Sequence, residues 1–150
     1  MNNTLKDRLI LLAAVQESMA AASDKMAEWD KSQLIMEKSA FDSLNLSDHV
    51  MKLSGEGSML ISRLLECCQS VVKNPSIAEQ KKMIAVLEEI HDVFHKINED
   101  SFSISEISHT IEAEAAAQRY LEESIRSELA EADVNIKTVA ACAEFAMADL

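Results

Sequence analysis

Residues that interrupt helices are scarce in this chain of 150 residues, which has two glycines and one proline. Aromatic residues make up only 4% of it, and strand-forming residues are correspondingly few. Apolar residues reach 48%, which is enough for a packed core and argues against disorder. The remainder leans on Ala, Leu, Ile, Met, Glu, Lys and Ser, most of which favour helices. The composition therefore predicts an all-α protein with few loops.

Basic residues are also in short supply. The chain has 14 Lys and Arg against 26 Asp and Glu, a formal net charge of −12. Binding to nucleic acid or to an anionic membrane surface requires clustered Lys and Arg, so neither partner is expected. No apolar run approaches the roughly 20 residues that a transmembrane helix needs.

Cysteine is too sparse for a disulfide framework. The three cysteines are Cys67, Cys68 and Cys142, and the two adjacent ones would point about 100° apart on a helix. Reduced thiols fit a cytoplasmic protein. The apolar run at residues 9–15 is short, follows Asp7 and ends at Gln16, so no secretion signal is expected.

A long apolar repeat dominates residues 83–143. Steps of four and three residues meet apolar side chains at fourteen of eighteen positions, with no Gly or Pro between them. Such a repeat predicts one long helix with a coiled-coil contact. The eighteen positions are Met83, Leu87, Ile90, Phe94, Ile97, Ser101, Ile104, Ser108, Ile111, Ala115, Gln118, Glu122, Ile125, Leu129, Ala132, Ile136, Val139 and Ala143.

The first half of the chain has two shorter repeats of the same spacing. One runs from Leu5 through Leu12, Met19 and Met26 to Ala40, and the other from Leu46 to Val71. The phase changes by one residue between them, so a break at residues 41–46 is a prediction that the sequence leaves open. A second open question is Gly55-Glu56-Gly57, where either a turn or a flexible helical hinge is expected.

The clearest turn is at residues 74–76. Pro75 disfavours helical geometry at Asn74, and Ser76 with Glu79 has the spacing of a capping box. This turn divides the chain almost in half, so the two arms can fold back on each other. The resulting antiparallel register places Gln33 opposite Gln118 and Gly57 opposite Phe94.

The repeats predict a single helical domain over residues 1–150, with arms at 4–73 and 77–148. Apolar residues beside the long repeat, such as Val93, Ile107 and Leu121, indicate a wider buried face than a two-helix hairpin needs. We therefore expect a long antiparallel hairpin that dimerises into a four-helix bundle. The alternative is a compact monomeric four-helix bundle, which requires breaks near residues 41–46 and 98–101, where Ser103 and Glu106 form a further capping-box pattern.

Candidate sites are few. Glu88, His91 and His95 share a helix face and suggest a metal site, but a bundle di-iron centre needs a second Glu-x-x-His and further glutamates. No catalytic residue, cofactor site or metal site is predicted, and the chain is not expected to be an enzyme. The expected interface residues are Ile90, Phe94, Ile97, Ile104, Ile111, Gln118, Ile125 and Leu129.

Residues 102–125 read FSISEISHTIEAEAAAQRYLEESI, with Ile104, Ile107, Ile111, Gln118 and Ile125 in heptad spacing. This segment resembles the cytoplasmic signalling helices of methyl-accepting chemotaxis receptors. The resemblance implies a dimeric antiparallel hairpin, signalling through changes in bundle packing, and reversible methylation, for which Glu122 and Glu123 are the candidates. It does not extend to the turn, VVKNPSIAEQ, which lacks the kinase-docking signature of the receptor tip.

The leading hypothesis from the sequence is a cytoplasmic, homodimeric, non-enzymatic signalling module that acts through coiled-coil contacts with itself and with signalling proteins. One alternative is a four-helix-bundle sensor or metal-binding protein. Another is a structural or secretion-related coiled-coil protein.

Overall fold

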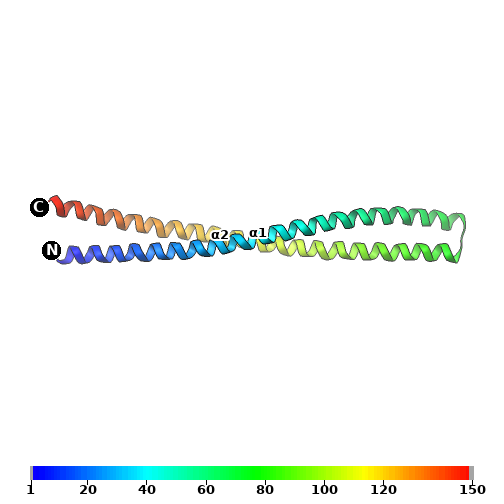
Figure 1. Cartoon of the computed structure of the whole chain (residues 1–150), viewed down its shortest axis with the longest axis horizontal. Helices are drawn as coiled ribbons and strands as arrows, with labels where there is room; N and C mark the ends of the chain where they lie inside the picture. Colours follow the sequence, from blue (N-terminus) through cyan, green and yellow to red (C-terminus); the bar gives the residue numbers. More distant parts are fainter. Residues whose placement is uncertain (1, 149–150) are drawn as a thin grey trace. The chain divides into compact units, whose positions relative to one another are not determined.

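The computed structural model describes residues 2–148, and the side chains of residues 5–143. Two helices account for nearly all of these residues: α1, Asn2–Lys73, and α2, Ile77–Ala148. They run antiparallel and pack against each other, joined by the turn at residues 74–76 (Figure 1). The predictions of an all-α fold and of a helical hairpin are confirmed.

The turn forms as its residues predict. The Ser76 hydroxyl accepts a hydrogen bond of 3.2 Å from the Glu79 N–H, which caps the first turn of α2. On the other side, the Asn74 N–H donates to the Ser70 carbonyl at 2.9 Å and closes α1. Pro75 lies between these two helix ends, and neither helix continues through it because its nitrogen has no hydrogen to donate.

None of the three breaks that the sequence left open is present. Helix α1 continues through residues 41–46 and through Gly55-Glu56-Gly57, and α2 continues through residues 98–103. The Ser103 hydroxyl donates to the Glu99 carbonyl at 3.2 Å, a bond typical of a helix interior and not of a cap. The compact four-helix monomer is therefore wrong, because it needs these breaks.

The side chains that face the partner helix recur every three or four residues without a phase change. We call them the inner positions. On α1 they are Arg8, Leu11, Val15, Ser18, Ala22, Lys25, Trp29, Ser32, Met36, Ser39, Ser43, Leu46, Val50, Leu53, Gly57, Leu60, Leu64, Cys67 and Val71. In the turn and on α2 they are Ser76, Glu79, Met83, Val86, Ile90, Val93, Ile97, Asp100, Ile104, Ile107, Ile111, Glu114, Gln118, Leu121, Ile125, Glu128, Ala132, Asn135, Val139 and Cys142. All of them are buried or half-buried.

The apparent phase change in the sequence has a simple origin. The repeat traced through Leu12, Met19 and Met26 lies one residue beyond the inner positions Leu11, Ser18 and Lys25. The inner face of α1 is largely polar in this segment. The apolar residues of the repeat therefore form a neighbouring stripe and do not show which side of α1 contacts α2. From residue 46 onward the apolar repeat follows the inner positions. When only the sequence is read, this change of stripe looks like a change of phase.

The contacts divide the chain into two units. Unit 1 comprises Met1–Met36 and Glu112–Leu150, and unit 2 comprises Glu37–Ile111. Each unit contains one segment of α1 packed on one segment of α2.

Unit 2 has an apolar centre. Leu53, Leu60 and Val93 form a buried cluster, and Ile90 and Ile97 pack against it. A Cβ built on Gly57 would lie 3.6 Å from Cγ1 of Val93, so the neighbour of Gly57 is Val93. The predicted pairing of Gly57 with Phe94 is wrong by one residue, because Phe94 points outward and is 46% exposed.

Unit 1 has a more polar centre. Eight of its eighteen inner positions carry charged or polar side chains: Arg8, Ser18, Lys25, Ser32, Glu114, Gln118, Glu128 and Asn135. Ser18 and Ser32 are the most buried of them, at 6% and 5% exposure. Gln118 Nε2 donates to Gln33 Oε1 at 3.1 Å, which confirms the predicted opposition of these two residues.

Because α1 continues through both glycines, each lowers the stability of a helix interior. We expect Gly55→Ala to raise the free energy of unfolding by about 0.5–1 kcal/mol, since a Cβ there meets nothing within 4 Å. Gly57→Ala should behave similarly, because its contact with Val93 is an ordinary van der Waals distance. Urea denaturation of both variants tests this. A loss of stability on either substitution would favour the hinge interpretation.

Candidate functional site

The predicted interface residues separate into two groups. Ile90, Ile97, Ile104, Ile111, Gln118 and Ile125 are half-buried at inner positions. Phe94 and Leu129 lie one residue beyond the inner positions and are 46% and 38% exposed. Val93, Ile107 and Leu121, which the sequence placed beside the repeat, also lie at inner positions and face α1.

The stripe that contains Phe94 and Leu129 continues along both helices. We call it the apolar flank and define it as every seventh residue from Leu5 to Cys68 on α1 and from Leu87 to Ala143 on α2; all but Leu5 directly follow an inner position. In unit 1 it consists of Leu5, Leu12, Met19, Met26, Gln33, Ala115, Glu122, Leu129, Ile136 and Ala143. In unit 2 it consists of Ala40, Ser47, Ser54, Ile61, Cys68, Leu87, Phe94, Ser101 and Ser108. Glu122 is the single charged residue among these nineteen.

In unit 1 the apolar flanks of α1 and α2 adjoin each other. A shallow groove there is lined by Met26, Trp29 and Asp30 from α1 and by Glu122, Ile125 and Arg126 from α2. Met26 and Glu122 are both flank residues, so the two flanks share one side of the unit. Leu5, Leu12, Met19 and Ile136 are 46% to 61% exposed on the same stripe.

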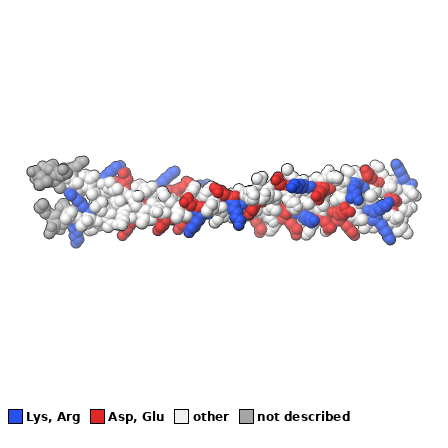
Figure 2. Space-filling model, in the orientation of Figure 1, with Lys and Arg blue, Asp and Glu red and all other residues white. Residues whose placement is uncertain are grey.

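The stripe on the opposite side carries more charge than the apolar flank. We call it the charged flank: Asp7, Ala14, Ala21, Glu28, Ile35, Asp42, His49, Glu56, Arg63 and Ser70 on α1, and Lys82, Glu89, Lys96, Ser103, Thr110, Ala117, Ser124, Glu131 and Thr138 on α2. Nine of its nineteen residues are Asp, Glu, Lys or Arg. In unit 2, Arg63 pairs with Glu89 at 3.5 Å, which places the charged flanks of both helices on one side. Acidic and basic side chains intermix over the surface in Figure 2.

Polar contacts between α1 and α2 interrupt the inner face of unit 1. Lys25 Nζ donates to Glu128 at 2.9 Å, and the Ser32 hydroxyl donates to the Glu114 carboxylate at 2.6 Å. The Arg8 guanidinium donates to the Cys142 carbonyl. Polar layers of this kind fix the register of a coiled coil while contributing less stability than apolar layers.

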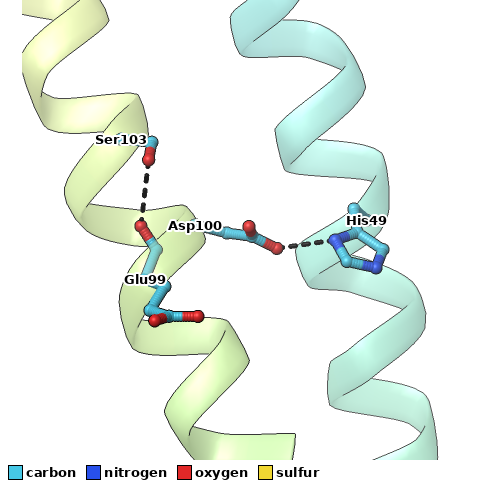
Figure 3. A network of polar contacts seen from close by, with 4 residues as sticks. All are labelled: His49, Glu99, Asp100 and Ser103. Atoms are coloured by element: carbon cyan, nitrogen blue, oxygen red, sulfur yellow. Dashed lines mark hydrogen bonds and ion pairs between the residues drawn. The ribbon is translucent and has the colours of Figure 1, made fainter.

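In unit 2, His49 and Asp100 form a polar contact between the two helices. The His49 ring Nδ1 lies 2.6 Å from the Asp100 carboxylate across the two helices (Figure 3). His49 remains 53% exposed at its side chain and Asp100 only 19%. Asp100 is an inner residue, and a carboxylate in such a position needs a hydrogen-bond partner. The His49 imidazole supplies that partner.

The candidate metal residues face away from the partner helix. His91 and His95 stack with ring centroids 6.5 Å apart, and their side chains are 84% and 66% exposed. His95 lies 3.3 Å from Glu99 on the same helix. Within the described residues no three His, Cys, Asp or Glu side chains are close enough together to hold a metal ion. The geometry therefore gives the metal-binding alternative no support.

The candidate modification residues Glu122 and Glu123 are both exposed. Glu122 falls on the long apolar repeat of the sequence, yet the structure places it on the apolar flank and not between the helices. Cys67, Cys68 and Cys142 are all free thiols and half-buried. The Cys68 thiol lies 3.8 Å from the Met83 sulfur.

Two further findings bear on function. No stretch of helix within residues 2–148 combines the length and the apolarity needed to cross a membrane. Comparison of the chain with known protein families, with curated proteins and with solved structures finds no match.

Proposed function

We propose that this chain is a non-enzymatic helical interaction module that self-associates through its apolar flank. In the proposed homodimer, two copies place their apolar flanks against each other and form a four-helix bundle. The module acts in signalling through changes in this packing and through contacts with other proteins. The three free cysteines favour the cytoplasm as its compartment.

The observation that carries the proposal is the exposed apolar flank. Leu12, Met19, Met26, Phe94 and Ile136 are each 46% to 51% exposed in the single chain. Thirteen of its nineteen residues are apolar, and monomeric proteins seldom expose a stripe that is largely apolar, whereas helices that join a bundle present one. The near absence of charge from the flank matches the depletion of charged residues at the centre of protein interfaces.

The polarity of the inner face in unit 1 supports the same conclusion. Since eight of its eighteen inner positions are polar or charged, the contact between its helices is less apolar than one with apolar residues throughout. Six further large apolar residues of unit 1 lie on the flank: Leu5, Leu12, Met19, Met26, Leu129 and Ile136. Covering the flank with a second copy would supply the hydrophobic burial that the pair of helices lacks.

The signalling assignment rests on the resemblance of residues 102–125 to the helices of chemotaxis receptors. Glu122 adds a specific expectation. As the single charged residue of the apolar flank, it would oppose packing while ionised, and methyl esterification would remove that charge. Glu123, which lies further from the flank, would have a weaker effect. Mass spectrometry of the protein from its native cells would test whether either residue is modified.

The proposed self-association is tested with two matched substitutions in unit 1. Ile136 on the apolar flank is 50% exposed, and Ile35 on the charged flank is 44% exposed. We expect the wild type to elute with twice the chain mass in size-exclusion chromatography with light scattering. Ile136→Glu should weaken the dimer at least about 10-fold, because it buries a carboxylate in the interface.

Ile35→Glu is the control, because it makes the same change on the side that stays in water. It should leave the dimer dissociation constant within about 3-fold of the wild type. A monomeric wild type, or equal effects of the two substitutions, would overturn the proposal. For the signalling role, a pull-down that recovers no receptor, adaptor or kinase would contradict the assignment.

A further inference from the structure

The two units differ in the side chains that pair their helices. In unit 2, fourteen of the twenty-one inner positions carry Leu, Ile, Val or Met, whereas in unit 1 seven of the eighteen carry Leu, Ile, Val, Met or Trp. Burial of apolar side chains is the main favourable contribution to the packing of one helix on another. For its length, the pairing of helices in unit 1 is therefore weaker than the pairing in unit 2.

Polar atoms inside unit 1 weaken its pairing further. Lys25 and Glu128 pair at 2.9 Å with only 27% and 25% of their side chains exposed, so both charges lose most of their water when the helices close. In the described part of the chain, the buried side-chain donors without a partner are Arg8 Nε and Trp29 Nε1, and both belong to unit 1. Separation of the helices returns these groups to water, which lowers the free energy needed to open unit 1.

From this contrast we infer that unit 1 opens in a single step while unit 2 stays paired. The opening concerns contacts within one chain, so it does not depend on the proposed dimer. Once α1 and α2 separate over unit 1, their backbone hydrogen bonds open as well, because helices in proteins owe most of their stability to packing. The chain then has a closed and an open state that differ in unit 1, and a partner that prefers one state shifts the population toward it.

Amide hydrogen exchange followed by NMR tests this opening at inner residues of equal burial. Ala22 and Ala132 in unit 1 are 2% and 3% exposed, and Val86 in unit 2 is 3% exposed, so burial alone predicts equal protection. We expect the amides of Ala22 and Ala132 to be protected about 10-fold less than that of Val86. Low concentrations of urea should bring the amides from Val15 to Met36 to one common free energy of opening. Equal protection in the two units, or protection that rises gradually from Val15 to Met36 as in fraying from the ends, would overturn the inference.

Substitutions in each unit separate this opening from unfolding of the whole chain. Leu53→Val weakens unit 2, which is paired in both the closed and the open state. The protection of Val86 should therefore fall about 3- to 10-fold, while that of Ala22 should stay within about 2-fold of the wild type. Replacing both Lys25 and Glu128 with Leu should raise the protection of Ala22 about 5-fold, because apolar packing replaces a desolvated ion pair. An equal fall at Ala22 and Val86 in Leu53→Val, or a fall at Ala22 in the double variant, would contradict the inference.

The exposed ion pair of unit 1 provides the matched control. Lys137 and Asp133 pair at 2.6 Å with 75% and 58% of their side chains exposed, so replacing both with Leu removes the same two kinds of charge from water. The protection of Ala22 should then stay within about 2-fold of the wild type, and a rise equal to that of the inner double variant would overturn the inference. Exchange is measured at several protein concentrations, because protection added by a second copy disappears on dilution. A wild-type monomer would refute the proposed function and leave the opening of unit 1 in place.

Discussion

Leu53→Ala is expected to lower the free energy of unfolding by about 2–5 kcal/mol, the largest effect of any single substitution proposed for this chain. Leu53 is 5% exposed and forms the buried cluster of unit 2 with Leu60 and Val93. Truncating it removes apolar contacts and leaves a cavity that the surrounding side chains fill only in part. Urea denaturation followed by far-UV circular dichroism, at one fixed protein concentration, measures the change.

Leu44→Ala is the matched control for this prediction. Leu44 lies on the same helix within unit 2, has the same side chain and is 62% exposed. Its truncation should change the free energy of unfolding by no more than about 0.5 kcal/mol. A cost at Leu44 as large as the cost at Leu53 would mean that the inner positions of α1 are wrongly assigned.

The architecture could be predicted because its determinants are local. Pro75 and the Ser76 cap define the one turn, and the scarcity of glycine and proline leaves both arms helical. Once the turn is located, antiparallel packing determines which residues oppose each other. Counting outward from the turn predicts the contact between Gln33 and Gln118, although the same count misplaces the neighbour of Gly57 by one residue.

The inner face could not be predicted in the same way. Both helices carry two neighbouring stripes of suitable spacing, and a periodic pattern cannot tell which one faces the other helix. On α2 the sequence favours Phe94 and Leu129 because they are large and apolar, whereas the structure buries Val93 and turns the half-buried Glu128 toward Lys25. The choice depends on pairing across the hairpin, which a one-dimensional pattern does not contain.

The same ambiguity explains the residues that seemed misplaced in the sequence. Glu122 looks like a charge inside an apolar contact, but it is a flank residue at the edge of a groove. Ser18 and Lys25 look like solvent-facing residues, but they lie between the helices. A second apolar stripe was detectable in the sequence. Its role as an outward-facing surface required the structure.

Trp29→Ala is the second large effect, expected to lower the free energy of unfolding by about 2–3 kcal/mol. Trp29 is the largest side chain at the inner positions of unit 1, where it also forms one wall of the groove with Met26 and Ile125. Unit 1 has few large apolar inner residues, so no neighbour can replace this contact. The estimate lies below the range for a fully buried tryptophan because Trp29 is half-buried.

Trp29→Phe separates the contribution of packing from that of the indole N–H. The Trp29 Nε1 atom is buried and has no hydrogen-bond partner among the described residues, an arrangement that costs free energy. Phe retains most of the apolar contact and removes the unpaired donor, so this variant should lie within about 1 kcal/mol of the wild type. Equal losses for Trp29→Phe and Trp29→Ala would show instead that the N–H has a partner in solution.

Trp29 is also the only tryptophan of the chain, so its fluorescence reports on the groove directly. If a second copy covers the apolar flank of unit 1, water leaves the groove as the dimer forms. The emission of the wild type should then shift to shorter wavelength with rising protein concentration, over the range in which the mass doubles. Ile136→Glu should move that shift to higher concentration and Ile35→Glu should not, because only Ile136 lies on the side that the second copy covers.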